Sequence, residues 1–280
     1  APVSNMSPAY FFGNALPALR YAHMVKIKAV FMPDPASADI KVTSLTKSFG
    51  DLTVLDNISF SIRQGEMVAV VGATGCGKTT FLNCLAGLTP ATSGSITIAG
   101  VPADPAVHNL AYVFQEPTAL PWLTVAENIA FGMRIKRMPS PAIRERLAAI
   151  AELVGLADMG NLYPNQISAS MMQRLAVARA FAVHPDLLLM DEPYGQMDVK
   201  LRFYLEDELV RLWQTLQSTV LFVTHNIEEA VYIADRILVL SAKPTTIKAE
   251  VPVNLPRPRD VVSQEFLNIR RTVTELIRWW

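Results

Sequence analysis

The sequence predicts an α/β fold with an antiparallel β-subdomain near its beginning and an inserted α-helical subdomain. Three observations indicate this architecture. An apolar, β-branched run at residues 68–71 leads directly into a glycine-rich loop and a helix-compatible segment. Residues 40–62 alternate apolar and polar side chains around a turn, which is typical of paired strands. Residues 124–183 are mostly helical in character and lie between strand-like segments.

Composition limits the class of protein. The chain has 280 residues, of which 51% are hydrophobic, with 25 basic and 25 acidic side chains. A net charge of zero gives no general attraction for nucleic acid, so we expect no nucleic-acid partner. No stretch reaches the roughly 18–20 apolar residues of a membrane-spanning helix, so action at a membrane would require a docking partner. The two cysteines, Cys76 and Cys84, predict a reducing cytoplasm and no disulfide scaffold.

Residues 1–39 differ from the rest of the chain. Several prolines interrupt any regular element there, and Met24 is a candidate start of translation. We interpret this segment as an N-terminal extension that is flexible or packs on a partner.

Regular elements follow from residue 40. Strands are expected at residues 40–48 and 54–62, joined by a turn at Gly50-Asp51, and at residues 94–100 and 110–115. Ser140 is expected to cap a helix whose first turn holds Pro141, and Gly155 to end it. Residues 186–191 and 219–224 indicate buried parallel strands. A tail helix at residues 264–280 would place one apolar stripe against the protein's own domain.

The glycine-rich loop carries the strongest chemical signal. Its pattern, Gly-x-x-x-x-Gly-Lys-Thr between a strand and a helix, predicts a phosphate-binding loop and therefore a P-loop NTPase core. The glycines let backbone N–H groups turn inward toward phosphate oxygens, and the following helix N-terminus favours anionic charge. Lys78 would reach the β- and γ-phosphates of a bound nucleotide, and the Thr79 hydroxyl would bind Mg²⁺. The nucleotide-binding residues are then Gly72, Ala73, Thr74, Gly75, Cys76, Gly77, Lys78, Thr79 and Thr80.

Two further strand ends add candidate catalytic groups. The apolar run 187–190 ends in Asp191 and Glu192, where the first carboxylate can hold Mg²⁺ and the second can polarise water as a general base. His225 follows the strand expected at 219–224, from which its imidazole could contact the γ-phosphate. A histidine at a strand end is more often structural, and its order after the two carboxylates is what makes it a candidate.

With these motifs in place, the chain resembles the ATP-binding subunit of an ABC transporter. The resemblance covers about residues 40–245 and implies an ABC ATPase domain with a helical subdomain at about 116–183, followed by a C-terminal tail, 246–280. It implies that Phe49 stacks on adenine and that Gln115 contacts Mg²⁺, water and a membrane subunit. It further implies a D-loop role for Asp198 and a switch role for His225.

One motif departs from that family. Where Leu-Ser-Gly-Gly-Gln is expected, the chain has Ile-Ser-Ala-Ser-Met at residues 167–171, which keeps Ser168 and loses both glycines. In the family this segment closes on nucleotide bound by a second subunit. If Ala169 or Ser170 needed a positive φ, the cost would be on the order of 1–2 kcal/mol, although the Ser170 hydroxyl could offset part of it. We hypothesise slow hydrolysis, or a partner chain with a better signature.

Two segments narrow the resemblance to importers of nitrate, sulfonates, taurine or bicarbonate: residues 115–129 and the Leu-Pro-Arg-Pro-Arg-Asp run at 255–260. The subfamily implies a second ATP-binding subunit as homo- or heterodimer, permease subunits docking near Gln115 to Val125, and an external solute-binding protein. It also implies a peripheral position on the cytoplasmic face of the inner membrane. Two alternatives stay open: a non-transport ABC ATPase, and a slow or regulatory nucleotide-binding subunit.

Overall fold

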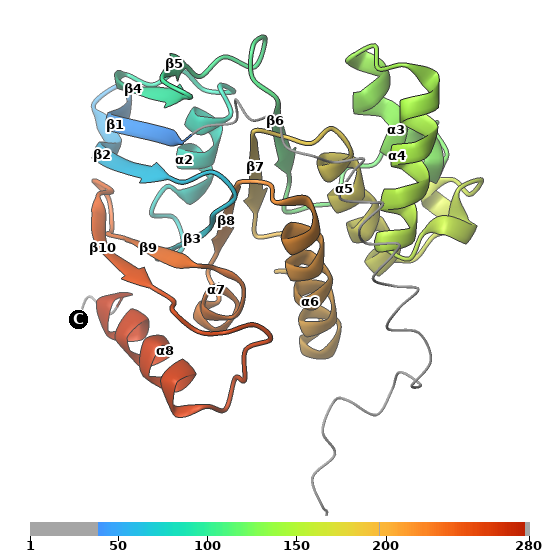
Figure 1. Ribbon diagram of the computed structural model, residues 1–280. Helices are drawn as coiled ribbons and strands as arrows, with labels where there is room; N and C mark the ends of the chain where they lie inside the picture. The colour runs from blue at the N-terminus through green and yellow to red at the C-terminus, as the bar shows by residue number, and fades with distance from the viewer. Residues whose placement is uncertain (1–38, 196, 278–280) are drawn as a thin grey trace, which may run out of the picture.

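The computed structural model, which describes residues 39–195 and 197–277, contains two β-sheets with helices packed around them (Figure 1). All but the last residue of the expected N-terminal extension lies outside the described residues. The smaller sheet is antiparallel in the order β2-β1-β4-β5. Its strands are β1 (Ile40–Phe49), β2 (Leu52–Ile62), β4 (Ser93–Ile98) and β5 (Val101–Pro102).

The larger sheet has the order β10-β9-β3-β8-β7-β6 and is parallel except for its edge strand β10. Every residue of its central strands β3, β7 and β8 is buried, as expected for a sheet covered on both faces. Its strands are β3 (Met67–Val71), β6 (Leu110–Val113), β7 (Leu187–Asp191), β8 (Val220–Thr224), β9 (Arg236–Leu240) and β10 (Ile247–Pro252).

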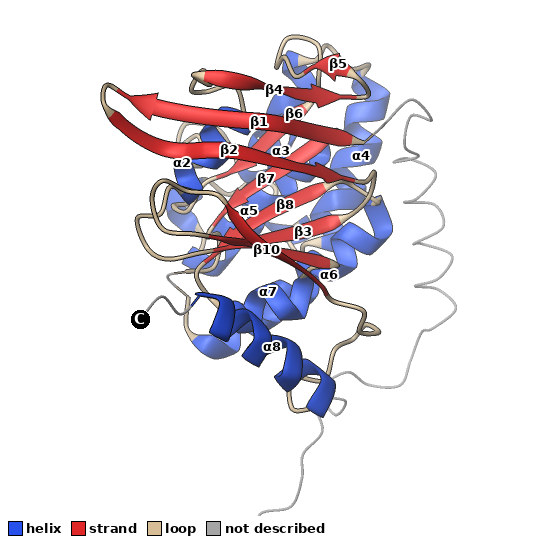
Figure 2. Cartoon of the chain, turned by 90° about the vertical axis from the view of Figure 1, so that its left-hand side faces the viewer, coloured by secondary structure: helices blue, strands red, loops and turns tan. Residues whose placement is uncertain are grey.

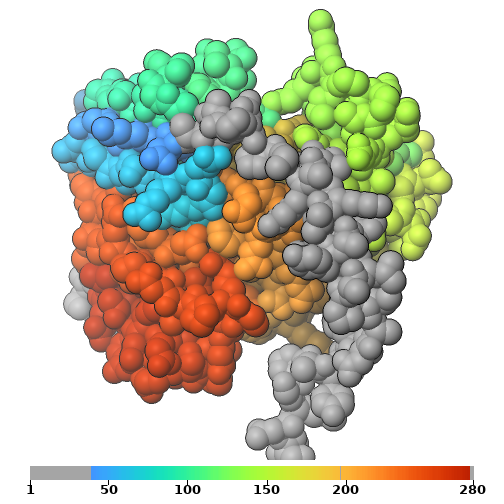
Figure 3. Space-filling view, in the orientation of Figure 1, coloured from blue at the N-terminus to red at the C-terminus, as the bar shows by residue number. Residues whose placement is uncertain are grey.

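Seven α-helices complete the described part of the chain. α2 (Lys78–Leu85) is enclosed with the smaller sheet, while α6 (Val199–Leu216), α7 (Ile227–Ile233) and α8 (Gln264–Ile277) cover the opposite face of the larger sheet (Figure 2). α3 (Val125–Ile135), α4 (Ser140–Leu153) and α5 (Ala169–Ala182), with two short 3₁₀ turns, form a lobe beside the sheets (Figure 3).

Alternation along the strands builds two cores. In β3, Val68 and Val70 pack with α2 and the smaller sheet, whereas Met67, Ala69 and Val71 pack with the helices of the other face. At roughly 25 cal/mol per Å² of buried apolar area, these two layers are the main stabilising term of the fold. The α/β fold with an antiparallel β-subdomain and an inserted helical subdomain is therefore confirmed.

The parallel strands of the larger sheet bring the predicted sequence motifs to one edge of that sheet. β3, β6, β7 and β8 all end at the same edge, where Asp191 pairs with Val223 and Val71 pairs with Thr224. Because ligands bind at the carboxyl ends of such strands, the segments that follow them meet at one place. This edge brings the glycine-rich loop beside Glu192 and His225.

Several local expectations need correction. The helix-compatible segment after the glycine-rich loop was expected at residues 81–88, but α2 begins at Lys78, because the helix follows Gly77 of the loop directly. Ser140 lies inside α4 and does not cap it through its side chain, while Pro139 occupies the capping position. Gly155 does follow the end of α4, with φ +65°. The sequence did not indicate α6, α7, β9 or β10.

The C-terminal segment is joined closely to the rest. β10 pairs with β9, so the boundary expected after residue 245 separates two strands of one sheet and not two structural units. The tail helix α8 buries Phe266 and Val273 fully against this part of the protein, as its apolar stripe indicated.

Candidate functional site

The glycine-rich loop wraps the N-terminal end of α2. Gly77 precedes the helix with φ +113°, and a Cβ there would lie 2.8 Å from Cγ1 of Val54, so only glycine fits. Gly75 also has a positive φ of +76°, with open space around it. Thr74, Gly75 and Thr79 are exposed to solvent, so the outer face of the loop is accessible to a ligand.

Lys78 points back into this loop. Its ammonium donates to the carbonyl oxygens of Gly72 and Ala73, each at 3.1 Å, and lies 3.7 Å from Oε1 of Glu192. The side chain is only 7% exposed. A buried ammonium held at the mouth of a phosphate loop is placed to meet phosphate charge.

Glu192 links the loop to the next strand. Its Oε2 lies 2.8 Å from Nδ1 of His225, so one carboxylate contacts both Lys78 and the imidazole. Glu192 also has a φ of 43°, an uncommon value for a residue other than glycine. Such conformations persist where the surroundings hold them, and they concentrate at functional sites.

Asp191 offers a hard oxygen ligand beside the loop. Tyr112 donates its hydroxyl to Oδ2 of Asp191 at 3.3 Å, and Thr79 forms a further hydrogen bond with the same carboxyl group. Burial raises the pKa of Asp191 above its ordinary value, and these two hydrogen bonds oppose the shift. A cation at this position would favour the ionised form.

The donor set fits Mg-ATP. Thr79 and Asp191 supply a hydroxyl and a carboxylate side by side, which suits Mg²⁺, a cation that keeps water and phosphate oxygens as its other ligands. Within residues 39–195 and 197–277, no three His, Cys, Asp or Glu side chains form an all-protein metal cluster. A magnesium site here would therefore depend on the nucleotide for the rest of its ligands.

Phe49 and Gln115 lie at the periphery of this arrangement. Phe49 ends β1 with 52% of its surface exposed, and the Lys47 ammonium lies 4.6 Å from the centre of its ring. The exposed part of this aromatic side chain is available for stacking on a base. Gln115 follows β6 and is exposed, at the same sheet edge as Asp191.

The variant signature lies in the helical lobe. Ser168 caps α5, its hydroxyl accepting from the Met171 N–H at 3.3 Å and lying 3.0 Å from the Ser170 hydroxyl. Ala169 and Ser170 form the first turn of this helix, and neither has a positive φ. The conditional cost of a positive φ therefore does not apply, because an ordinary helical turn carries both residues.

Asp198 has a local role in this chain. Its carboxylate caps α6 by accepting from the Leu201 N–H at 3.1 Å. The structure therefore brings together the loop, Asp191, Glu192 and His225, whereas the side chains of Ser168, Ser170 and Asp198 form hydrogen bonds at the starts of their own helices.

Two residues that support the site were not predicted from the sequence. Thr245 is fully buried and donates its hydroxyl to the Cys76 carbonyl oxygen, which ties the loop to the end of the larger sheet. Tyr112 supports Asp191 and stacks on Phe114, with ring centres 4.3 Å apart. Neither residue lies in a motif: Tyr112 belongs to β6, and Thr245 forms an isolated bridge with Leu55 in the connection between β9 and β10. Cys76 is 3% exposed, and burial raises the pKa of its thiol, so it is not an activated thiol.

Comparison with known proteins agrees with this geometry. Residues 55–195 match the family model described as ABC transporter. An uncharacterized ABC transporter ATP-binding protein of Methanocaldococcus jannaschii is 39% identical, over 91% of this chain and 97% of the relative. The nitrate import ATP-binding protein NrtD of Synechocystis is 36% identical (83% and 89%), and the aliphatic sulfonates import ATP-binding protein SsuB of Bacillus cereus is 38% identical (84% and 94%).

A solved structure is similar as well. The dimeric structure of a bacterial ABC transporter cassette aligns with a TM-score of 0.67 and 29% identity, covering 78% of this chain and all of that one. Family match, relatives and the arrangement of Lys78, Asp191, Glu192 and His225 lead to one conclusion. The chain belongs to the ABC transporter family, as an ATP-binding subunit.

Proposed function

We propose that the chain binds and hydrolyses ATP to energise an importer of a small anion or sulfonate-type solute, as an ABC-type translocase. The observation that carries the proposal is the carboxylate of Glu192, which lies between Lys78 and His225 at the ends of three parallel strands. The relatives named for nitrate import and for aliphatic sulfonates import support the class of solute. They also disfavour both alternatives, a non-transport ATPase and a regulatory subunit.

Each group has a task in this proposal. Bound Mg-ATP would supply the γ-phosphoryl group and the cation, which Thr79, Asp191 and Gln115 would hold. Lys78 and the loop N–H groups stabilise negative charge on phosphate oxygens. Glu192 orients or deprotonates the attacking water as general base, and His225 holds the Glu192 carboxylate in place from the side opposite Lys78.

A second ATP-binding subunit completes the site. Thr74, Gly75 and Thr79 are exposed, and Ser168 lies in the separate helical lobe, so nothing within the described chain covers the outer face of the loop. We infer a head-to-tail homo- or heterodimer in which Ser168 and Ser170 of one chain face the loop of the other. The dimeric form of the solved cassette supports this arrangement.

Permease subunits are the second class of partner. Phe114, which precedes exposed Gln115 in the chain, and Trp122, seven residues after it, are 42% and 69% exposed. Large exposed apolar groups beside polar ones are typical of protein contact sites. We infer that permease helices dock near Gln115 to Val125, which would place the subunit peripherally on the cytoplasmic face of the inner membrane, with an external solute-binding protein in the assembled importer.

No helix within residues 39–195 and 197–277 has the length and hydropathy to cross a bilayer. Attachment to a membrane in this proposal therefore runs through the permease contact and not through these helices.

The test combines purification and one substitution. The chain is isolated from native membranes with whatever accompanies it, and ATP turnover is measured for wild type, Glu192→Gln and the control Glu145→Gln on the exposed face of α4. We expect a hydrophobic permease in the complex, and a loss of about 10²–10⁴-fold in turnover for Glu192→Gln alone. Ribosomal or DNA-repair partners, or full turnover by Glu192→Gln, would contradict the proposal.

A further inference from the structure

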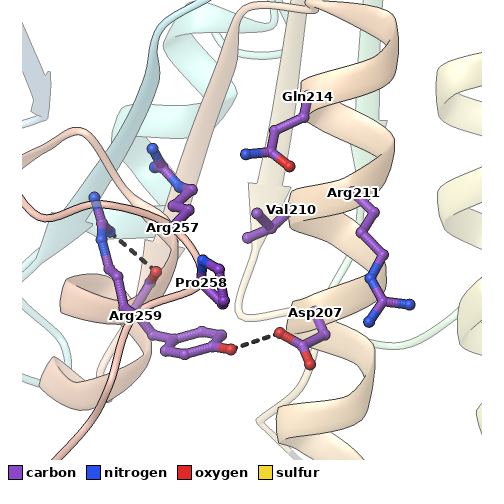
Figure 4. Close-up of a pocket in the computed structure, with 8 residues that line it drawn as sticks. Asp207, Val210, Arg211, Gln214, Arg257, Pro258 and Arg259 are labelled. Carbon is purple, nitrogen blue, oxygen red and sulfur yellow. Dashed lines mark hydrogen bonds between the residues drawn. The ribbon is translucent and has the colours of Figure 1, made fainter. Parts of the chain in front are cut away.

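The Leu-Pro-Arg-Pro-Arg-Asp run has no task in the proposed function, yet it lies against a functional element. Residues 255–259 follow β10 and pass the C-terminal end of α7, the helix that begins two residues after His225 (Figure 4). The same loop lines a hollow of about 310 Å³ with Asp207, Val210, Arg211 and Gln214 of α6.

Arg259 binds the end of α7 directly. Nη1 donates to the carbonyl oxygens of Val231, Tyr232 and Ala234 at 2.8, 3.0 and 2.6 Å, and Nη2 donates to that of Val253 at 3.1 Å. The residue is 6% exposed. A guanidinium at a helix C-terminus satisfies carbonyl groups that have no partner within the helix and complements their negative dipole end.

Its charge is retained there. Burial and the neighbouring Arg257 lower the pKa of Arg259 to about 10, so the guanidinium is still charged at neutral pH. Burying a charged side chain is costly unless it is well bonded. Four carbonyl acceptors supply that compensation, and three of them belong to the end of one helix.

Arg257 connects this region to β3, the strand that leads into the phosphate loop. Its guanidinium donates to Oδ1 of Asp235 at 2.8 Å and lies 4.6 Å from the ring centre of Trp213. The other carboxylate oxygen of Asp235 accepts from the Met67 N–H at 3.0 Å, at the start of β3. The end of α7 is thereby fixed relative to the strand that leads into the phosphate loop.

The opposite end of α7 holds His225. Asn226 caps the helix by accepting from the N–H groups of Glu228 and Glu229 at 3.0 and 3.4 Å. Its own N–H donates to the Thr224 hydroxyl at 2.9 Å, and that hydroxyl donates to the buried carboxyl of Glu229. With Thr224 and Asn226 both tied to α7, a shift of this short helix would carry the His225 backbone with it.

We propose that Arg259 is a positioning residue for His225, acting by holding α7 at its C-terminal end. The helix spans seven residues, about 10 Å at 1.5 Å per residue, which is one rigid unit between Arg259 and the imidazole. The inference rests on the proposed function for its effect on turnover, but the placement of His225 can be measured without ATP.

The experiment uses the full chain and its histidine ring signals in NMR spectra. The His225 ring signal is the one that disappears in His225→Gln. Glu192→Gln, which removes the carboxylate beside the ring, gives the position of this signal without the contact, called here the uncoupled position. Arg259→Ala is expected to move this signal toward the uncoupled position, with the signals of His108 and His184 unchanged. Turnover should fall about 10-fold with ATP affinity unchanged, the pattern of a displaced catalytic group.

Arg270→Ala is the matched control. Arg270 also reaches α7, through an exposed ion pair with Glu228 at 3.0 Å, but it does not bind the helix end. It should leave ring signals and turnover unchanged. If Arg259→Ala does not fold, Arg259→Lys takes its place, since one ammonium cannot span the carbonyl groups that the fork binds.

The outcomes separate the two proposals. An unmoved His225 signal in a folded Arg259 variant overturns the positioning role, even if turnover falls. A moved signal with turnover at the wild-type level also overturns it, because the contact then has no consequence for the reaction. Absence of ATP turnover in the wild-type complex contradicts the proposed function instead, and leaves the ring signals as the decisive reading on Arg259.

Discussion

The phosphate loop and the segment around Ser168 are proposed to act on the same nucleotide, yet the chain prepares them differently. The loop is held from several sides: Lys78 binds its carbonyl groups, Thr245 binds its backbone, and Glu192 contacts the ammonium. Ser168 is exposed and serves its own helix as a cap. Within one chain, the loop is already held in place, whereas the Ser168 segment is exposed and available to a second chain. This difference is expected if each nucleotide site is shared between two chains.

The largest effect is expected from the loop itself. Lys78→Ala removes the buried ammonium, and we expect turnover to fall by at least about 10²-fold, together with a loss of ATP affinity in the single chain. Equilibrium binding of a fluorescent ATP analogue measures the second effect. Lys248→Ala, an exposed lysine of β10, is the control and should bind normally. Normal binding by Lys78→Ala would remove the loop from the site.

A smaller and different effect is expected at the signature. Ser168→Ala deletes the cap of α5, which should cost about 1 kcal/mol of unfolding free energy, and it should lower turnover of the assembled complex. ATP affinity of the isolated chain should stay unchanged, because Ser168 does not reach the loop of its own chain. A loss of affinity in the isolated chain would erase the contrast between the two regions.

Glu206, a buried carboxyl group of α6, predicts that the free energy of unfolding depends on pH. The segment around Ser168 holds no such group. Burial, and the charge of Glu229, raise the pKa of Glu206 from 4.5 to about 8. The folded state therefore binds more protons than the unfolded state in that interval, and unfolding free energy should fall as pH rises through it, by at most about 1.4 kcal/mol per pH unit for each proton.

Glu206→Gln should flatten this dependence, whereas Glu265→Gln on the surface of α8 should leave it intact. Urea unfolding at several pH values between 5 and 8 measures the slope. An unchanged slope in Glu206→Gln would assign the dependence to other groups.

The smallest effect concerns the missing glycines. Ala169 and Ser170 adopt ordinary helical conformations, so the double change Ala169→Gly, Ser170→Gly should alter turnover less than about threefold, and should cost about 1–2 kcal/mol of stability through the flexibility of glycine. A large gain in turnover would show that the two Cβ atoms obstruct closure of the dimer.

The sequence was most informative where a motif is continuous. The loop, its strand and its helix follow one another along the chain, so spacing alone located Lys78 and Thr79. Asp191 and Glu192 were found because they end an apolar strand, but their contact with Lys78 depends on strand order, which no local pattern encodes.

Hydrogen bonds between residues far apart in the chain could not be predicted from such local patterns. Thr245 lies 169 residues from Cys76, the residue whose carbonyl it binds, and Tyr112 lies 79 residues from Asp191. The short elements α7, β9 and β10 were not indicated either, because their pattern is set by burial against neighbours and not by a period of their own. The helical conformation of Ala169 and Ser170 could not be predicted either, because the absence of glycine at these positions does not specify their φ angles.

Cross-linking between chains tests the shared site most directly. One chain carries Ser168→Cys and the other Thr74→Cys, both with Glu192→Gln to slow hydrolysis, and a short thiol-specific cross-linker is added with or without Mg-ATP. The native Cys76 and Cys84 are buried and serve as the unreactive background. A covalent dimer that forms only in the mixture, and only with ATP, is the result expected if each loop is closed by the other chain. No cross-link with ATP, or a cross-link within a single chain carrying both changes, would contradict that claim.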